Sequence, residues 1–376
     1  MTSKKEPLFR VVRRVGIPFW KKMLLYVAAV VIALAFGALL LLALDVPVAE
    51  YYKKVFTMGT IDNKFAYKNI EGLIKLTVPL LITSLALSLA FKMKFWNIGG
   101  EGQFIIGAIA ASALALLLGD SMSPWLLIPL MSLGGFLAGG LYGVGPAVLK
   151  VKFGTNETLM TLMLNYIALY VLFFFAETQG AWNFFLSSAS VRPVFQKFAE
   201  SAQMPLLDIG FDRFRLNFSL VIAVLLYILI FFYLKKTKQG YEISVVGDSI
   251  NTAKYAGMKV NRIIIRTMFL SAALIGLAGA FYVSSAAGLS AAVTNDVGWT
   301  GIIVAWLAKL NPVFIFVTSV LISVLQFGCT NAAADFSAID SNFADLLQGL
   351  ILFIILAADF FISFKIVFRK SGKEVK

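Results

Sequence analysis

Residues 23–45 read MLLYVAAVVIALAFGALLLLALD, and this stretch sets the class of the protein. It contains no charged side chain until Asp45. An apolar helix of this length crosses a hydrocarbon core about 30 Å thick. A basic tail precedes the stretch, it has no small-residue cleavage site, and it is too long for a signal peptide. We therefore expect it to be retained as a membrane span.

The rest of the chain has the composition of an integral membrane protein. Of its 376 residues, 60% are hydrophobic and only 14% are charged, and the mean hydropathy is +0.86. A soluble domain is usually nearer half apolar and one quarter charged. The composition therefore predicts that most of the chain lies in the bilayer.

Ten apolar runs follow one another along the chain. They predict an all-α polytopic membrane protein with about ten transmembrane helices. Helices are favoured because the runs are solid rather than alternating. The runs lie near residues 23–44, 72–91, 98–118, 124–148, 158–176, 217–234, 263–283, 299–309, 313–328 and 345–364.

Basic residues between the runs predict the orientation of the chain. Lysine and arginine gather in the cytoplasmic loops of membrane proteins, so the formal net charge of +13 needs no nucleic acid to explain it. We expect a transmembrane domain at 23–364 with both termini in the cytoplasm. The predicted cytoplasmic parts are the basic tails 1–22 and 365–376 and the loop 235–262, and the predicted extracellular loops are 45–71 and 177–216.

The run GWTGIIVAWLAKL at 298–310 decides the number of crossings. As a helix it would rise only about 20 Å, which is short of a full span. Asn311 and Pro312 follow it, and proline both breaks a helix and disfavours helix in the residue before it. Fusion with 313–328 would leave nine crossings and an external basic tail. We therefore expect two segments and ten crossings, with the first segment tilted, broken or buried as in many transporters.

The chain lacks the usual ingredients of an enzyme site. It has no phosphate-binding loop of the form G-x-x-x-x-G-K-[ST], no nucleophile elbow and no cluster of metal ligands. It contains no histidine, and its one cysteine, Cys329, excludes an intrachain disulfide framework. We therefore expect a conduit or scaffold rather than an enzyme, with no cofactor or metal in this chain.

A polar corner interrupts the apolar pattern at KMKFWNIGGEGQFIIG, residues 92–107. Asn97 is placed to cap a new helix, and Glu101 then falls in its first turn, where the positive end of the helix dipole favours a carboxylate. Lys92 and Lys94 are possible partners for this carboxylate. We therefore interpret Glu101 as a structural anchor near an inner gate rather than as a proton carrier.

A second polar position lies in the run 158–176. Thr158, Thr161 and Asn165 share one helix face, at spacings of three and seven residues. Because a buried polar group needs a partner, Asn165 either makes an interhelical hydrogen bond or contacts a transported solute. The sequence leaves both readings open.

Two further patterns concern packing. Gly135, Gly139 and Gly143 recur every four residues on one face of the run 124–148, which predicts a close helix–helix contact. Other polar residues in the spans are candidates to face the bundle interior or a water-filled cavity, and several of them lie near helix ends, where the cost of burial is small. They are Asn156, Glu157, Gln326, Asp345, Gln348 and Asp359.

The loop 235–262 contains a predicted helix of its own. Within DSINTAKYAGM, Asp248 or Ser249 can cap the start of the helix and Gly257 can end it. A solvated connector would not need such a helix, so we interpret it as a docking element on the cytoplasmic side. Its small-residue surface is formed by Ala253 and Ala256.

Four motifs resemble, in their order, the permease subunit of ABC importers of the ribose/branched-chain amino acid superfamily. They are FWNIGGEGQFIIGA, TNETLMTLMLNYIA, TKQGYEISVVGDSINTAKYAGM and GIIVAWLAKLNP. Within that superfamily they look most like the branch for nucleosides and simple sugars, including guanosine and purine nucleoside permeases. The resemblance covers nearly the whole chain from about residue 70 onward, whereas the preceding part matches only as a basic tail plus one span.

The resemblance implies a type II ABC importer fold and several partners in a bacterial cytoplasmic membrane. A separate ATPase, often with two fused nucleotide-binding domains, would hold ATP and Mg²⁺. A sister permease would complete a heterodimer, and a substrate-binding lipoprotein would deliver a nucleoside from outside. The cytoplasmic helix would then couple this chain to the ATPase. The coupling residues implied are Gly240, Gly247, Asp248, Ser249, Asn251, Ala253, Ala256 and Gly257.

The resemblance also directs attention to the polar residues as a pathway or gate. Carboxamides can hydrogen-bond a sugar or nucleobase, and an indole can pack against its face. The residues expected in this role are Glu101, Gln103, Thr161, Asn165 and Trp306. Trp306 is as well explained as a packing residue, and the stretch from Trp306 to Lys309 departs from the ALLG of many relatives.

Three arginines in the extracellular loop 177–216 are candidates for docking the binding protein. They are Arg192, Arg213 and Arg215, although ordinary surface charges are the safer interpretation of these residues.

Two alternative functions stay open. An ABC permease for ribose or another simple sugar would share the same pattern. A secondary transporter coupled to ions, or a channel, would need an internal carboxylate relay, for which Glu101, Asp345 and Asp359 are the candidates.

Overall fold

The computed structural model describes residues 9–13, 18–61, 63–188, 190–208, 210, 214–336, 338–340 and 342–368. The chain divides into two compact units. Unit 1 combines the N-terminal segment through Met58 with the C-terminal segment from Gly328, and unit 2 spans Gly59–Phe327. The helix α12 (Pro312–Ala333) begins in unit 2 and ends in unit 1.

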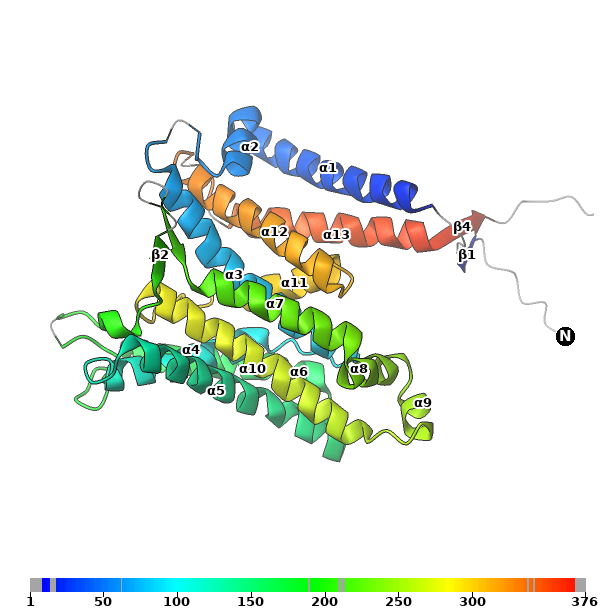
Figure 1. Ribbon diagram of the computed structural model, residues 1–376. Helices are drawn as coiled ribbons and strands as arrows, with labels where there is room; N and C mark the ends of the chain where they lie inside the picture. Colours follow the sequence, from blue (N-terminus) through cyan, green and yellow to red (C-terminus); the bar gives the residue numbers. More distant parts are fainter. Residues whose placement is uncertain are drawn as a thin grey trace, which may run out of the picture. The chain divides into compact units, whose positions relative to one another are not determined.

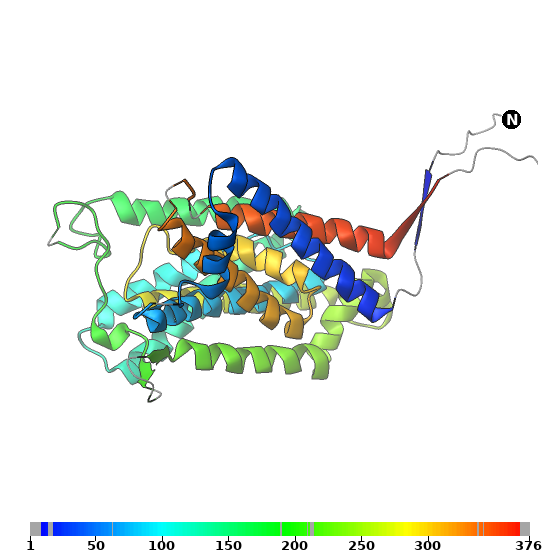
Figure 2. The ribbon, with the colours of Figure 1, turned by 90° about the horizontal axis from the view of Figure 1, so that it is seen from above.

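Unit 1 is built on two long helices, α1 (Phe19–Ala43) and α13 (Phe343–Ser363), which run side by side (Figures 1 and 2). The hydroxyl of Tyr26 in α1 donates to Asp359 Oδ1 in α13 over 2.6 Å. Asp359, one of the sequence's candidate relay carboxylates, therefore has a partner within this helix pair.

The two long helices lead into a pair of short antiparallel strands, β1 (Phe9–Arg13) and β4 (Phe364–Phe368). The sequence predicts only basic tails here, and this strand pairing is missed. Residues 1–8, 14–17 and 369–376 of the predicted tails lie outside the described residues.

A shorter helix, α2 (Val48–Thr57), completes unit 1. Its Tyr51 is fully buried and contacts the rings of Phe336 and Phe343 edge-on or tilted. Gly328 allows α12 to approach α2, because a Cβ there would clash with the carbonyl of Val55. The predicted loop 45–71 is therefore partly helical.

Unit 2 holds most of the helices that are long enough to cross a membrane. They are α3 (Ala66–Lys92), α4 (Gly100–Leu118), α5 (Pro124–Phe153), α6 (Glu157–Glu177), α7 (Ser219–Lys236) and α10 (Val260–Ala286). With α1, α12 and α13, the described part of the chain contains 9 helices of sufficient length and hydropathy. The predicted mostly helical, multi-span fold is confirmed.

The one predicted segment that is too short to count among these nine is 299–309, which forms the helix α11 (Val297–Leu307) with 11 residues. Lys309 and Leu310 adopt left-handed backbone angles, and Asn311 Oδ1 then accepts from the amide of Val313 at the start of α12. This turn separates α11 from α12. The prediction of two segments split at Asn311-Pro312 is confirmed.

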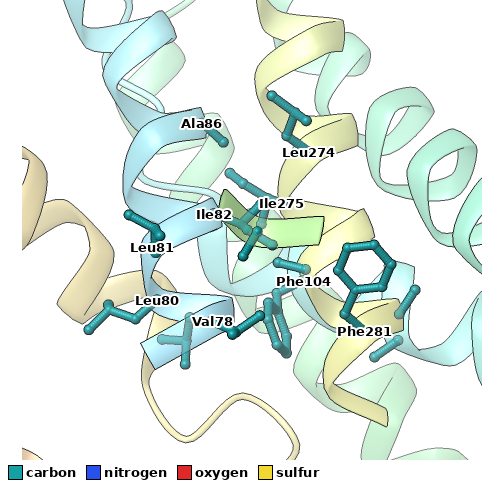
Figure 3. Packing of buried hydrophobic residues seen from close by; sticks show 14 of the residues in the cluster. Val78, Leu80, Leu81, Ile82, Ala86, Phe104, Leu274, Ile275 and Phe281 are labelled. Atoms are coloured by element: carbon teal, nitrogen blue, oxygen red, sulfur yellow. The ribbon is translucent and has the colours of Figure 1, made fainter. Parts of the chain in front are cut away.

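The core of unit 2 forms where α10 packs against α3, α4 and α5. Figure 3 shows Ile82 and Ala86 of α3 facing Leu274 and Ile275 of α10, with Phe104 of α4 beside them. All five side chains are 5% exposed or less. This layer positions the start of α4, which the next subsection describes.

The glycine repeat of α5 packs on α10, as its spacing predicts. A Cβ at Gly139 would lie 2.7 Å from the Cα of Gly276 and 2.8 Å from the carbonyl oxygen of Ala272. Gly135 and Gly143 are equally close to α10. Since these distances leave no room for a methyl group, glycine is needed for the backbones to meet.

The cytoplasmic loop predicted at 235–262 is more helical than its composition suggested. It contains α8 (Lys238–Asp248) and α9 (Ile250–Tyr255). Thr237 caps α8 through the amide of Gly240, and Ser249 caps α9 through the amide of Thr252. The predicted docking helix of two or three turns is therefore corrected to a six-residue helix that begins after Ser249.

The predicted loop 177–216 contains a 3-10 turn (Glu200–Ala202) and a small hairpin of β2 (Leu206–Asp208) and β3 (Arg215–Asn217). The turn returns to the helical bundle, because Ser201 Oγ donates to the carbonyl of Gly119. Ser284 Oγ of α10 donates to the carbonyl of Ala202 over 2.8 Å.

Candidate functional site

The candidate site is centred on the α4 corner, which we define as residues 93–103. After α3 ends, the chain folds back beside it and α4 begins inside the bundle. A Cβ at Gly100 would contact Leu87, which lies five residues before the end of α3. With a rise of about 1.5 Å per residue, the first turn of α4 lies about 8 Å deeper in the bundle than the end of α3.

A pair of carboxamides holds the corner together. Asn97 Nδ2 donates to Gln103 Oε1 over 3.1 Å, and Gln103 Nε2 donates to Asn97 Oδ1 over 2.9 Å. Asn97 Oδ1 also accepts from the amide of Gly99, which is the residue that precedes the helix. The prediction that Asn97 caps α4 is therefore corrected: Asn97 binds the turn before the helix and fastens it to Gln103.

Asn165 of α6 satisfies two backbone groups of the same corner. Its Nδ2 donates to the carbonyl of Ile98 and its Oδ1 accepts from the amide of Gly102, each over 2.8 Å. Gly102 carries one of the first amides of α4, which have no partner within their own helix. The structure thus shows the interhelical hydrogen bonds that were one reading of Asn165, while a contact with solute stays a prediction.

Thr161 lies one turn before Asn165 and binds the corner as well. Its hydroxyl accepts from the amide of Ile98 over 3.2 Å and donates to the carbonyl of Glu157 in its own helix over 2.8 Å. Both Thr161 and Asn165 are buried. The shared helix face predicted from spacing therefore docks on the start of α4.

Glu101 joins α4 to a helix far away in sequence. Its Oε2 accepts from the amide of Gly298 over 2.8 Å, in the first turn of α11. The first turns of α4 and α11 therefore meet inside the bundle, and the carboxyl group of Glu101 lies at the positive ends of both helices. The predicted place in the first turn of α4 is confirmed.

The predicted partners of Glu101 were Lys92 and Lys94. The structure instead shows its Oε2 accepting from the amide of Gly298 in α11. The two lysines are separated from it because α4 starts below the end of α3, where both lysines lie. The spacing of residues in the sequence does not show how far inside the bundle α4 starts.

Trp306 lies at the other end of α11 and takes part in an aromatic cluster. Its indole stacks on Trp96 of the α4 corner, with ring centroids 5.3 Å apart and planes at 13°. Phe91 of α3 contacts both indoles. The structure therefore supports the interpretation of Trp306 as a packing residue, and its role in a pathway stays a prediction.

All five residues predicted for the pathway thus converge on the α4 corner. Glu101 and Gln103 belong to it, Thr161 and Asn165 bind it from α6, and Trp306 stacks on Trp96. Sequence reasoning did not identify Gly298, since a glycine partner of a carboxyl group has no local signal. A second polar contact of α11 was also missed: Gln326 Nε2 of α12 donates to Thr300 Oγ1 over 3.3 Å.

A second group of residues, which we call the connector cluster, links α8 and α9 to this corner. It contains Met93 and Phe95 of the corner together with Ile243 and Val246 of α8 and Ala253 of α9, all buried. Lys150 of α5 lies over the ring of Phe95 at 4.9 Å and forms an ion pair with Glu157. The connector cluster therefore places the predicted coupling segment against the start of α4.

The predicted coupling residues divide between this interior and the surface. Ala253 was predicted to form part of the exposed face of α9, and the structure corrects this, because Ala253 is fully buried. Ala256 and Gly257 are exposed, and so is Tyr255, which is 94% exposed and was missed from the sequence. Asn251 is exposed at the first turn of α9.

The two glycines predicted to shape the approach of this segment lie where backbones nearly touch. A Cβ at Gly247 would clash with the carbonyl oxygen of Lys92, at the end of α3. A Cβ at Gly240 would lie 2.6 Å from the carbonyl oxygen of Leu234 in α7. Asp248 and Ser249 form the junction between α8 and α9.

The predicted docking arginines are only partly placed. Arg192 is exposed on the loop after α6. The amide of Arg215 donates to Glu71 Oε1 over 2.9 Å, which fixes the backbone of β3. Arg213 lies outside the described residues.

Comparisons with known proteins fit this architecture. The sequence profile of a family described as the permease component of the branched-chain amino acid transport system matches residues 69–356. No solved structure was found to match the chain.

Characterised relatives match over nearly their full length. The guanosine ABC transporter permease protein NupP of Bacillus subtilis is 29% identical over 88% of this chain and 92% of its own. The nucleoside ABC transporter permease protein NupB of Lactococcus lactis is 29% identical over 89% of this chain and 91% of its own. A glucose ABC transporter permease of Haloferax volcanii is 27% identical over 95% and 94%, respectively.

These relatives are transport components rather than enzymes, which agrees with the missing catalytic ingredients. The family profile covers most of the chain, including the α4 corner, α8, α9 and α11. The chain therefore belongs to the family of permease components of the branched-chain amino acid transport system type.

Proposed function

We propose that this chain is the membrane-spanning permease subunit of an ATP-driven importer of nucleosides, with purine nucleosides preferred. The observation that carries this proposal is the similarity over almost the whole chain to a guanosine and a nucleoside ABC permease. The polar α4 corner, built from two carboxamides, a carboxyl group and stacked indoles, is compatible with a solute that has both hydrogen-bonding groups and a flat ring.

The proposal includes partners that hold the ATP chemistry. A separate ATPase, with two fused nucleotide-binding domains, binds ATP and Mg²⁺. A sister permease completes a heterodimer, and a substrate-binding lipoprotein delivers the nucleoside. The importer lies in a bacterial cytoplasmic membrane with both termini of this chain, and α8 and α9, on the cytoplasmic side. Support for this orientation comes from the basic residues of the tails and of 235–262.

Contacts within this chain suggest how the ATPase acts on the pathway. The exposed face of α9, with Tyr255 and Ala256, docks on the ATPase, and the buried Ala253 anchors α9 to the connector cluster. A displacement of α9 then reaches Met93 and Phe95. Since packed side chains and backbones in contact move together, it continues into the α4 corner.

The α4 corner is where such a displacement would switch access. Asn165 and Gln103 hold the start of α4, and Glu101 ties it to the start of α11. Interrupted helices whose positive ends lie within the bundle are common at the solute sites of transporters. A movement of the corner would therefore change the positions of α4 and α11 together.

Uptake by the assembled importer tests this function. The complex of both permeases, ATPase and binding protein is reconstituted in proteoliposomes, and ATP-dependent accumulation of labelled guanosine is measured with unlabelled nucleosides, ribose and glucose as competitors. We expect competition by purine nucleosides and none by the sugars. Competition by glucose or ribose alone would assign the chain to sugar import.

A second arm of the same experiment addresses coupling. Vesicles that contain the permeases without the ATPase receive a proton gradient, and no accumulation is expected. Accumulation under this condition would show an ion-coupled transporter and contradict the proposed mechanism.

A further inference from the structure

A basic hollow lies where α8 and α10 begin, and it includes the residues that join α9 to α10. Its volume is about 420 Å³, within the range of small-ligand pockets. Its polar lining consists of Lys238, Tyr241, Glu242, Lys259, Arg262 and Arg266. Ala256, Gly257, Met258 and Ile263 complete the lining. Ala256 also belongs to the face proposed above for the ATPase, whereas the six polar side chains have no role in that proposal.

The charge of the hollow is strongly positive. Four cationic side chains line it against one carboxylate, that of Glu242. This carboxylate is already engaged, because Arg266 Nη2 donates to Glu242 Oε2 over 3.0 Å. Lys238, Lys259 and Arg262 are exposed and form no ion pair within the described part of the chain. The hollow therefore offers three uncompensated positive charges to an anion.

Arg266 adds a donor from the interior of the hollow. Its Nε is buried and has no hydrogen-bond partner among the described residues. Buried polar atoms in native proteins usually have a partner, so an orphaned guanidinium nitrogen calls for an explanation. A bound oxyanion would supply the missing acceptor, since arginine forms its strongest hydrogen bonds with such groups.

The position of the hollow along the helices selects the kind of anion. The apolar part of α7 ends at Leu234, just before Lys235 and Lys236, and α8 starts two residues later. Arg262 and Arg266 lie in the first two turns of the spanning helix α10. The hollow is therefore at the level where a span leaves the hydrocarbon, which is where lipid headgroups lie.

We propose that this hollow binds the phosphate group of an anionic membrane lipid. The three uncompensated cations attract the headgroup, and Arg266 binds its phosphate oxygens. Tyr241, which is 63% exposed, provides an amphipathic ring of the kind found at the membrane interface. Basic pockets between spanning helices are known sites for acidic headgroups. Because the hollow touches α8, a bound lipid would brace the segment that positions α9.

The test compares lipid retention by three forms of the full-length chain. The forms are the wild type, a hollow variant with Lys259→Gln and Arg262→Gln, and a control variant with Lys235→Gln and Lys236→Gln. The control removes the same charge at the end of α7, outside the lining of the hollow. Each form is placed in nanodiscs of phosphatidylcholine alone or mixed with phosphatidylglycerol, and retained lipid is counted by native mass spectrometry.

We expect wild type and control to retain phosphatidylglycerol and the hollow variant to bind it about thirty-fold more weakly, from the typical effect of two basic residues near an anionic surface. Equal weakening in hollow and control variants would show that only general surface charge acts, and would overturn the proposal. So would undiminished retention by the hollow variant. The thermal melting curve of each variant in nanodiscs of phosphatidylcholine alone shows whether the variant is folded.

Two further arms keep the result decisive. If the hollow variant is poorly folded, a charge-preserving variant with Lys259→Arg and Arg262→Lys is used, and we expect it to retain the lipid. Loss of retention by this variant despite a normal melting temperature would contradict a site based on charge. Inorganic phosphate is also added to wild type in phosphatidylcholine. Stabilisation by phosphate equal to that by phosphatidylglycerol would assign the hollow to a free phosphate compound instead of a lipid.

Discussion

Replacing Gly298 by alanine tests the contact between α4 and α11 most directly. A Cβ at this position would lie 2.6 Å from the Cα of Glu101, and closer still to its backbone nitrogen. Ordinary contacts of a Cβ begin at 3.4 Å. The nearest obstructing atom is the backbone nitrogen of Glu101 at 2.3 Å, which no rotamer change can move, so α11 must move away from α4 by about 1.1 Å to restore an ordinary contact.

The same displacement weakens the hydrogen bond at this contact. Its length of 2.8 Å would increase to about 3.9 Å, beyond hydrogen-bonding range. Loss of a hydrogen bond to a charged group costs about 1.5–3 kcal/mol, and overpacking adds about 1–3 kcal/mol. We therefore expect Gly298→Ala to destabilise this contact by about 2.5–6 kcal/mol, which is a large fraction of the stability of a typical domain.

Gly100→Ala is a matched control on the opposite helix. Its Cβ would lie 3.5 Å from the Cα of Gly298, which is an ordinary contact distance. ATP-dependent uptake and thermal melting of the reconstituted importer are measured for both variants. We expect Gly298→Ala to lose uptake and to melt at a lower temperature, and Gly100→Ala to resemble wild type. Uptake by Gly298→Ala equal to that by Gly100→Ala would refute the view that close approach of α4 and α11 is required.

Three other predictions concern separate parts of the chain. Asn165→Leu leaves the carbonyl of Ile98 and the amide of Gly102 buried without partners, and each unpaired group costs about 1–3 kcal/mol of stability. Melting temperature and uptake should therefore fall together. Loss of uptake with an unchanged melting temperature would indicate a contact with solute instead. Ala256→Trp on the exposed face of α9 should uncouple ATP hydrolysis from uptake while the chain stays folded. In contrast, Ala253→Trp in the connector cluster should impair folding. Normal substrate-stimulated hydrolysis by the importer with Ala256→Trp would contradict docking through this face. Burial raises the pKa of Tyr52 to about 12, and its hydroxyl donates to the carbonyl of Leu34. Because the folded state holds this proton more tightly, the contribution of Tyr52 to stability is complete below pH 10 and is lost as the pH rises from 10 to 12. Tyr52→Phe should therefore reduce the fall of the melting temperature between pH 10 and pH 12, and an unchanged fall would exclude Tyr52 as its source.

Several features of the fold are predictable because their signals are local. A run of apolar residues is sufficient for a spanning helix, and Asn311-Pro312 is sufficient to separate α11 from α12. Ser249 as a helix cap and the four-residue spacing of Gly135, Gly139 and Gly143 depend only on nearby sequence. The family could also be inferred from motifs that recur in order.

Local signals fail where a short helix ends, because Ala253 lies within α9 and Ala256 is the residue that follows it. Ala253 and Ala256 are the same residue type three positions apart in one segment, yet one is buried and the other exposed. Their difference depends on how α9 packs against the connector cluster. The helix α8 was missed for a related reason, since its stability comes from the burial of Ile243 and Val246 rather than from a strongly helical composition.

The sequence by itself determined the membrane class, the series of spans, the turn before α12 and the place of Glu101 in the first turn of α4. Only the tertiary structure decided what Glu101 binds. Its partner, the amide of Gly298, is 197 residues away and becomes available because α11 starts inside the bundle next to α4. Hydropathy and capping act between neighbours in the chain, whereas the meeting of two helix ends depends on the packing of every helix between them.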